Sequence, residues 1–178
     1  MPQIANSESR APLKGNTMPT LEPTRRDLLA SAATIALVLA SRSIANADDE
    51  MAMKVWKDPS CGCCSAWIEH VRTAGFKAEV IDSADMSKIK AKLGLPAKLA
   101  SCHTAEIGPY VVEGHVPAEA IKRLLSEKSL SGGLAVPGMP VGAPGMEVPG
   151  IEPDVYEVIS FGPAGERTFG RYRGHARV

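Results

Sequence analysis

The chain has 178 residues, and its 20 lysines and arginines balance 20 aspartates and glutamates, so the formal net charge is zero. Zero net charge gives no electrostatic reason to expect nucleic-acid binding, and an apolar content of 44% excludes wholesale disorder. The 16 glycines and 14 prolines have no collagen-like period. No unbroken apolar run of about 18 residues crosses the body of the chain, which excludes a polytopic membrane protein. We therefore expect one modest globular domain.

Residues 1–47 have the layout of a cleaved export signal. The pair Arg25-Arg26 precedes a short apolar run, Leu28–Ala40, and Ala45-Asn46-Ala47 is a small-residue cleavage site. The arginine pair and its neighbours resemble a twin-arginine signal, whose pathway exports folded proteins across a bacterial inner membrane. An ordinary secretory signal and, more weakly, a retained anchor are the alternatives. We expect the mature protein to begin at Asp48, to be periplasmic, and not to associate with the membrane.

The mature domain, residues 48–178, would hold 131 residues once 47 are removed from 178. The leader contains five of the lysines and arginines and three of the acidic residues, which leaves 15 against 17 and a net charge of −2. A domain of this size buries roughly two thirds of its unfolded surface, enough for a core without obligatory disulfides. The four cysteines therefore need another explanation.

Hydrophobic periodicity predicts the elements of the first two thirds of the mature chain. Trp67, Val71 and Ala74 recur at spacings of four and three, which indicates a helix, and Gly75 stands where that helix would end. Pro117 suits the first turn of a later helix. In chain order we expect a strand at 53–57, a helix from about 65 to 75, a strand at 77–82, a short helix at 87–93, a strand at 110–113 and a helix at 117–125.

The segment from Ser131 to Gly150 has a different composition, with six glycines and four prolines among twenty residues. That density predicts a long loop without a helix or a central strand. Val155–Phe161 and Arg167–Tyr172 flank a Gly-containing turn and predict a C-terminal β-hairpin. The order of elements favours an α/β fold in which helices cover one mixed sheet.

Three of the four cysteines lie together where the first strand gives way to the first helix. Cys61 and Cys64 form a CxxC pair with Cys63 inside it, and Cys102, followed by His103, is the fourth. Unpaired backbone N–H groups and the helix dipole favour thiolate over thiol at a helix N-terminus. The thiolate is both a nucleophile and a metal ligand, so this cluster carries the chemistry of the sequence.

Three hypotheses explain the cysteines. Two structural disulfides would suit an exported domain, but adjacent Cys63 and Cys64 would need partners on different sides. A thiol–disulfide oxidoreductase would use Cys61 to attack and Cys64 to resolve, which leaves two cysteines unexplained. A soft-metal site uses all four.

The metal hypothesis favours copper. Neighbouring side chains on a helix point about 100° apart, so one ion would hardly take both Cys63 and Cys64. A mononuclear zinc site would instead use Cys61, Cys64 and Cys102 with His103. Four thiolates around one divalent ion leave a charge of −2, whereas several univalent ions neutralise them, and thiolates select Cu(I). We predict that the site binds Cu(I), with more than one ion; silver or zinc are the alternative ions for the same site.

Other candidate ligands are weaker. Met139 and Met146 lie in the Gly/Pro-rich loop, where their thioethers could supplement the thiolates, although methionine more often fills a core. His103 is the best histidine candidate because it adjoins Cys102. His115 precedes a helix, and a role as a turn or cap residue is favoured over a role as a ligand. His70 lies about 10 Å along the helix from Cys63, too far to share an ion with it.

Four motifs in order resemble the CopG-like copper-resistance proteins, the exported metal-binding family rather than the repressors that share the name. The motifs are Cys61-Gly62-Cys63-Cys64 with Trp67 and His70, Cys102-His103-Thr104, Val112–Pro117, and Gly138-Met139-Pro140 with Pro144–Glu147. The resemblance covers about residues 54–172. It implies a thioredoxin-like core, a periplasmic setting, association with copper-efflux or other copper-handling proteins, and metal ligation by Cys61, Cys63, Cys64 and Cys102.

The sequence thus predicts a periplasmic copper-binding protein of copper resistance, with a thiol–disulfide or copper oxidoreductase as the alternative. Copper binding and disulfide formation compete for the same thiolates, so the residues alone do not separate the two functions. Gly62 stands where typical thioredoxins have proline between the cysteines, which disfavours the oxidoreductase.

Overall fold

The computed structural model describes residues 51–178. The predicted export signal at residues 1–47 and the mature start at Asp48 lie outside the described residues and remain predictions. Within the described part of the chain, no helix has the length and apolar character needed to cross a membrane.

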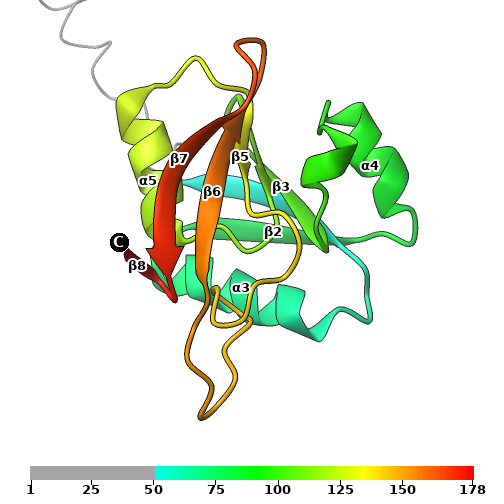
Figure 1. Ribbon diagram of the computed structural model, residues 1–178. Coiled ribbons are helices and arrows are strands. Elements are labelled where there is room, and N and C mark those ends of the chain that lie inside the picture. Colours follow the sequence, from blue (N-terminus) through cyan, green and yellow to red (C-terminus); the bar gives the residue numbers. More distant parts are fainter. Residues whose placement is uncertain (1–50) are drawn as a thin grey trace, which may run out of the picture. The chain divides into compact units, whose positions relative to one another are not determined.

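Twelve elements form the described part of the chain, and eight of them are strands of one mixed sheet (Figure 1). Along the sheet the strands run in the order β2-β1-β3-β4-β5-β6-β7-β8. The elements are β1 (Ala52–Lys57), α3 (Gly62–Thr73), β2 (Lys77–Asp82), α4 (Met86–Lys92), the 3₁₀ helix η2 (Ala97–Leu99), β3 (His103–Ile107), β4 (Tyr110–Glu113), α5 (Ala118–Glu127), β5 (Gly133–Ala135), β6 (Val155–Phe161), β7 (Arg167–Arg173) and β8 (Ala176–Arg177).

The first half of the sheet has a thioredoxin-like arrangement, as the resemblance implied. β1 and β2 are parallel and are joined through α3, whereas β3 pairs antiparallel with both β1 and β4, and α5 follows β4. β5 then adds parallel to β4, and the predicted C-terminal hairpin, β6 and β7, extends the sheet. The predicted α/β fold with a mixed sheet and covering helices is confirmed.

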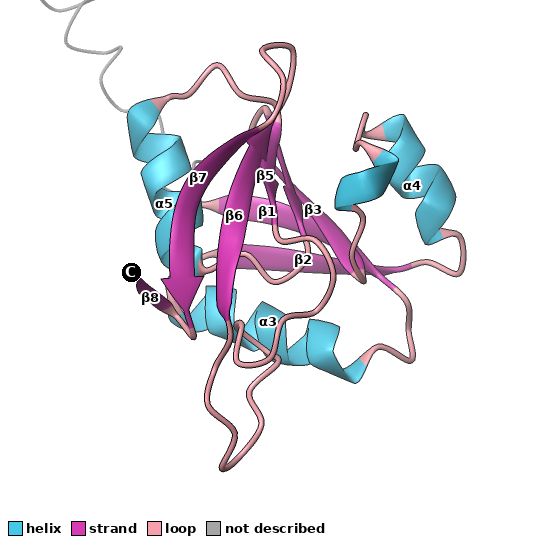
Figure 2. Cartoon of the chain, in the orientation of Figure 1, coloured by secondary structure: helices cyan, strands magenta, loops and turns pink. Residues whose placement is uncertain are grey.

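Two hydrophobic cores lie on the sheet. The larger one packs apolar residues of α3 and α5, such as Trp67 and Ile121, against β1, β3 and β4. The smaller one holds Leu95 and Leu99 near η2 with Val111 and Phe161 from the strands. Figure 2 shows α4 and α5 on opposite sides of the strands. The sheet is therefore covered on both faces, which suits the nearly continuous burial of β3 and β4.

Most predicted elements are confirmed, but the first helix begins earlier than its apolar spacing indicated. α3 starts at Gly62 with Cys61 as its N-cap, so Cys63 and Cys64 already lie in its first turn. Pro117 is the N-cap of α5 rather than a residue of its first turn. The strand β3 was not predicted, because its sequence, His103-Thr104-Ala105-Glu106-Ile107, has two buried polar residues that break the apolar pattern.

The expectation that the segment 131–150 contains no central strand is wrong. β5 lies between β4 and β6 and is fully buried, while the predicted Gly/Pro/Met loop begins after it. Glycine is required here rather than disruptive: a Cβ on Gly133 would lie 1.9 Å from the Val111 carbonyl oxygen. The close approach of β4 explains why a glycine-rich sequence can form a buried strand.

His70 joins α3 to the start of α5. Its Nε2 accepts a hydrogen bond from the Ala118 backbone N–H at 3.0 Å, and its ring meets that of His175 at 4.8 Å. Burial and, after it, the neighbouring His175 lower the pKa of His70, which Glu147 partly opposes, and the net value is about 4. A protonated His70 would lose its acceptor and leave the first turn of α5 without this partner.

We expect the free energy of unfolding to fall with acidity in a way that depends on His70. The folded pKa, about 4, lies below the ordinary histidine value of 6.5, so the unfolded chain binds the proton more readily between these pH values. Stability is therefore complete above pH 6.5 and decreases towards pH 4, by up to about 3 kcal/mol. Urea unfolding of the wild type and of His70→Gln across this range measures the effect. Parallel pH profiles of the two proteins would contradict it.

Candidate metal centre

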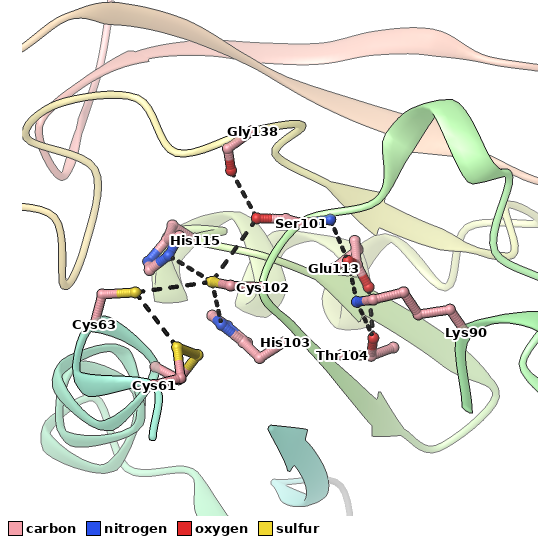
Figure 3. Close-up of polar contacts among 11 residues, drawn as sticks. Cys61, Cys63, Lys90, Ser101, Cys102, His103, Thr104, Glu113, His115 and Gly138 are labelled. Atoms are coloured by element: carbon pink, nitrogen blue, oxygen red, sulfur yellow. Dashed lines mark hydrogen bonds and ion pairs between the residues drawn. A yellow bond between two sulfur atoms is a disulfide. The ribbon is translucent and has the colours of Figure 1, made fainter. Parts of the chain in front are cut away.

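The four cysteines converge at the start of α3 (Figure 3). The antiparallel register places His103, at the beginning of β3, opposite Lys57, at the end of β1. Cys102 therefore enters the sheet beside the turn that leads from β1 to Cys61. The Cys63 and Cys102 sulfurs lie 3.9 Å apart, and those of Cys61 and Cys63 lie 3.5 Å apart. The predicted convergence of two distant segments is present.

Cys61 and Cys64 are joined by a disulfide, whereas Cys63 and Cys102 are free thiols. Cys61 is partly exposed at the N-cap of α3, and Cys64 is completely buried under it. The hypothesis of two structural disulfides is therefore not what the structure contains. The structure combines an oxidised CxxC pair with two thiols beside it.

All four sulfurs lie within 4.8 Å of one another. Cys63 and Cys64 both lie in the first turn of α3, where neighbouring side chains point in different directions. Their sulfurs are nevertheless close, so the expectation that they diverge too far to share one ion is not supported. The Cys61 and Cys64 sulfurs are bonded to each other, so the four sulfurs could surround a single tetrahedral ion or a cluster only after this bond is reduced. The number of ions must come from chemistry rather than from these distances alone.

Cys102 is held as a neutral thiol between two imidazoles. Burial, and then the neighbouring Cys63, raise the pKa of Cys102 to about 11. The His115 Nδ1 donates a hydrogen bond to the Pro144 carbonyl at 2.8 Å, so its Nε2 is free to accept from the Cys102 thiol at 3.1 Å. Metal binding at Cys102 must therefore displace this proton.

His103 lies on the other side of Cys102, with its Nδ1 3.4 Å from the sulfur. The ring is completely buried, 4.3 Å from the Trp67 ring, and its Nε2 has no hydrogen-bond partner. Burial, followed by the charges of His115 and Lys90, lowers its pKa well below the ordinary range. His103 is therefore a neutral imidazole whose Nδ1 faces the cysteine cluster, in the place where the sequence predicted a ligand.

Sequence reasoning undervalued His115. Its ring is completely buried and meets the His103 ring edge-on at 5.0 Å, and the two histidines and Cys102 form a second group with ligand atoms within 4.8 Å of one another. The hydrogen bond from its Nδ1 to a backbone carbonyl is the usual support of a metal-binding histidine. His115 follows β4, and Cys102 directly precedes β3, with which β4 pairs. This pairing, which the sequence does not show, brings His115 to Cys102. His70, by contrast, lies outside both groups.

The Gly/Pro/Met loop packs against the same end of α3. A Cβ on Gly145 would lie 2.7 Å from the Cys63 carbonyl oxygen, so the loop backbone contacts the helix backbone at this point. Met146, next to it, is partly buried against the larger core, whereas Met139 is 57% exposed. The predicted ligation by Met139 and Met146 remains a prediction.

A buried carboxylate anchors the segment that carries Cys102. Glu113 is completely buried and accepts hydrogen bonds from the Ser101 backbone N–H, the Thr104 hydroxyl and the Lys90 ammonium group. Because successive side chains of β3 alternate between faces, Thr104 points to this network while His103 points to the cysteines. Ser101 also donates to the Gly138 carbonyl of the loop at 2.6 Å (Figure 3). No sequence pattern indicated this network.

The fold and site define a thioredoxin-like domain whose cysteine cluster can hold a metal ion. Two solved structures are similar to it, described as copper resistance protein CopG, form 1 and form 2. Form 1 is 44% identical, with 70% of this chain and 99% of that chain covered and a TM-score of 0.65. Form 2 is also 44% identical, with 68% of this chain and 97% of that chain covered and a TM-score of 0.64.

A family model described as a protein of unknown function, DUF411, matches residues 99–146, which include Cys102, both buried histidines and part of the Gly/Pro/Met loop. No curated protein matches the chain significantly. The identity and coverage of the CopG structures place the chain in the CopG-like copper-resistance family, as the four motifs indicated.

We expect Glu113→Gln to destabilise the domain strongly. The substitution leaves the Lys90 ammonium group, which is 13% exposed, without its charged partner, and such a change costs about 3 to 5 kcal/mol. Thermal and urea unfolding measure the loss. Glu69→Gln is the matched control, because the Glu69–Arg72 pair is exposed and should contribute less than about 1 kcal/mol. Equal, small effects of both substitutions would show that the buried pair does not anchor the segment.

Proposed function

We propose that the protein is a periplasmic copper-binding protein that acts in copper resistance and binds Cu(I) through Cys61, Cys63, Cys64 and Cys102. The observation that carries the proposal is the convergence of four sulfurs within 4.8 Å of one another. Family membership supports copper as the ion, since the similar solved structures are described as copper resistance proteins. Thiolates are soft ligands and select Cu(I) over harder ions.

The disulfide state governs access to this site. The Cys61–Cys64 bond must be reduced by two electrons before all four sulfurs can act as thiolates. Four thiolates carry a charge of −4; one divalent ion or two univalent ions lower it to −2, and three or more univalent ions lower it further. This charge balance favours a multinuclear Cu(I)–thiolate site, and it applies equally to silver. A single zinc ion would satisfy the same sulfurs with less charge compensation.

The periplasmic location rests on the predicted export signal, and it suits a site that alternates between disulfide and metal-bound thiolates. A copper-binding protein in that compartment would exchange its ions with copper-efflux or other copper-handling proteins. Cys61 and Cys63 are partly exposed, so a partner's ligand can reach the cluster from the α3 side.

Anaerobic titration of the fully reduced protein with Cu(I) should saturate at more than one ion per chain. The physical reason is the neutralisation of four thiolates by univalent ions. Competition with a chromophoric Cu(I) chelator, together with elemental analysis of the protein, gives the stoichiometry. Saturation at one ion per chain would contradict the multinuclear site and support a mononuclear one.

Cys63→Ser is the matched variant for this titration. It removes one of the four sulfurs but leaves the Cys61–Cys64 pair intact, so the oxidised protein should still contain its disulfide. We expect fewer Cu(I) ions per chain and weaker binding. An unchanged stoichiometry would mean that Cys63 takes no part.

A thiol–disulfide or copper oxidoreductase is the second candidate, and the Cys61–Cys64 disulfide is the observation that favours it. Cys61 is partly exposed and could attack a substrate disulfide, while the buried Cys64 could resolve the mixed disulfide. The reduced pair would pass two electrons and two protons to the substrate and become the disulfide itself.

Reduction of insulin disulfides by the metal-free, reduced protein separates the two candidates. We expect a rate far below that of a thioredoxin. Gly62 stands where typical thioredoxins have proline, and the Cys63 sulfur lies 3.5 Å from that of Cys61 and restricts access to it. Cys61→Ser should abolish whatever activity remains. A thioredoxin-like rate would contradict the proposal of a binding protein and support oxidoreductase activity as the primary function.

A further inference from the structure

The described cysteines and histidines form two potential ligand groups that share Cys102. The first contains the four sulfurs, and the second contains Cys102, His103 and His115, with all ligand atoms within 4.8 Å of one another (Figure 3). Only the first group includes Cys61 and Cys64. The second group therefore keeps all its donor atoms when those two cysteines are joined in the disulfide.

The distances in the second group suit an ion between its members. The Cys102 sulfur lies 3.1 Å from the His115 Nε2 and 3.4 Å from the His103 Nδ1. A tetrahedral zinc ion holds sulfur and nitrogen ligands about 3.5 Å apart. The two S···N distances are therefore within a few tenths of an ångström of the value that one ion would impose, and the ligand atoms of the two histidines lie within 4.8 Å of each other.

Both imidazoles present a nitrogen atom to the Cys102 sulfur. The hydrogen bond from the His115 Nδ1 to the Pro144 carbonyl directs the Nε2 lone pair towards Cys102, as it does in histidines that bind metal. Both rings are completely buried, and each has one nitrogen atom beside the Cys102 sulfur. If His103 coordinates through Nδ1, its Nε2 carries the ring proton, and this buried atom has no hydrogen-bond partner among residues 51–178, so His103 lacks the support that His115 has.

We propose that Cys102, His103 and His115 form a second, mixed nitrogen–sulfur metal site that takes one divalent ion while Cys61 and Cys64 are disulfide bonded. One thiolate and two imidazoles suit borderline ions such as Cu(II), Zn(II) and Co(II), whereas the all-sulfur site suits Cu(I). The site deepens the proposed copper function, but it depends on two residues that the thiolate site does not use. The oxidised protein would then retain a place for one metal ion.

Co(II) is the probe, because it reports its ligands spectroscopically and does not oxidise thiols. The oxidised wild type, with two free thiols verified by counting, is titrated anaerobically with Co(II). We expect one Co(II) per chain, intense visible bands of a tetrahedral ion, and a sulfur-to-cobalt charge-transfer band. X-ray absorption of this complex should count one sulfur and at least two nitrogen ligands. No binding, or a coordination shell without nitrogen or without sulfur, would overturn the second site.

Variants assign the ligands. Cys102→Ser should lose the charge-transfer band, and His115→Gln should weaken Co(II) binding at least about tenfold. His70→Gln is the matched control, because His70 is a partly buried histidine outside both ligand groups and should leave the binding unchanged. Unaltered Co(II) binding in His115→Gln with a native circular dichroism spectrum would exclude His115 and overturn the proposal.

A double variant, Cys61→Ser with Cys64→Ser, separates this inference from the proposed function. It cannot form the four-sulfur site but keeps the second group, so it should still bind one Co(II) and should lose multinuclear Cu(I) binding. If it binds no Co(II) while the reduced wild type binds Cu(I), the second site is wrong and the thiolate site stands. If the reduced wild type binds no Cu(I) but the double variant binds Co(II), the proposed thiolate site is wrong and the second site stands.

Discussion

The antiparallel pairing of β1 with β3 is the constraint on which the site depends. The register opposes Lys57 to His103, so the end of β1 and the beginning of β3 are neighbours in the sheet. The chain leaves β1 through a short turn to Cys61 and enters β3 through Cys102, although the two cysteines are 41 positions apart in the sequence. Hydrogen bonds between two backbone segments therefore bring the sulfurs together before any metal or disulfide does so.

Alternation along β3 separates two kinds of chemistry. His103 points towards Trp67 and the cysteines, while Thr104 points to the opposite face and the Glu113 carboxylate. Burial of Glu113 with Lys90 is costly, and the pair is tolerated because the carboxylate accepts three hydrogen bonds. An apolar pair of similar size could supply about the same stability. The network, however, also holds the backbone on both sides of Cys102 and so positions its sulfur.

Cys102 connects the two proposed metal sites with the redox state of the CxxC pair. In the disulfide form, Cys102 has Cys63 on one side and the neutral imidazole of His115 on the other, and burial keeps its thiol protonated. Reduction would add two thiolates to the sulfur side. In the two proposals the protein thus offers either a soft, all-sulfur environment or a mixed environment, and the difference between them is a single covalent bond.

The sequence by itself determined the mixed α/β sheet, most helices and strands, and the four cysteines, because apolar periodicity and CxxC spacing are local properties of the chain. It failed at β5, where a close approach of β4 demands glycine, and at β3, whose buried polar residues hide its period. Only the tertiary structure placed His115 and Glu113, since their partners, Cys102 and Lys90, lie 13 and 23 positions away and meet them through strand pairing and helix packing. Long-range pairing decides which polar side chains share a buried site, and no local pattern records it.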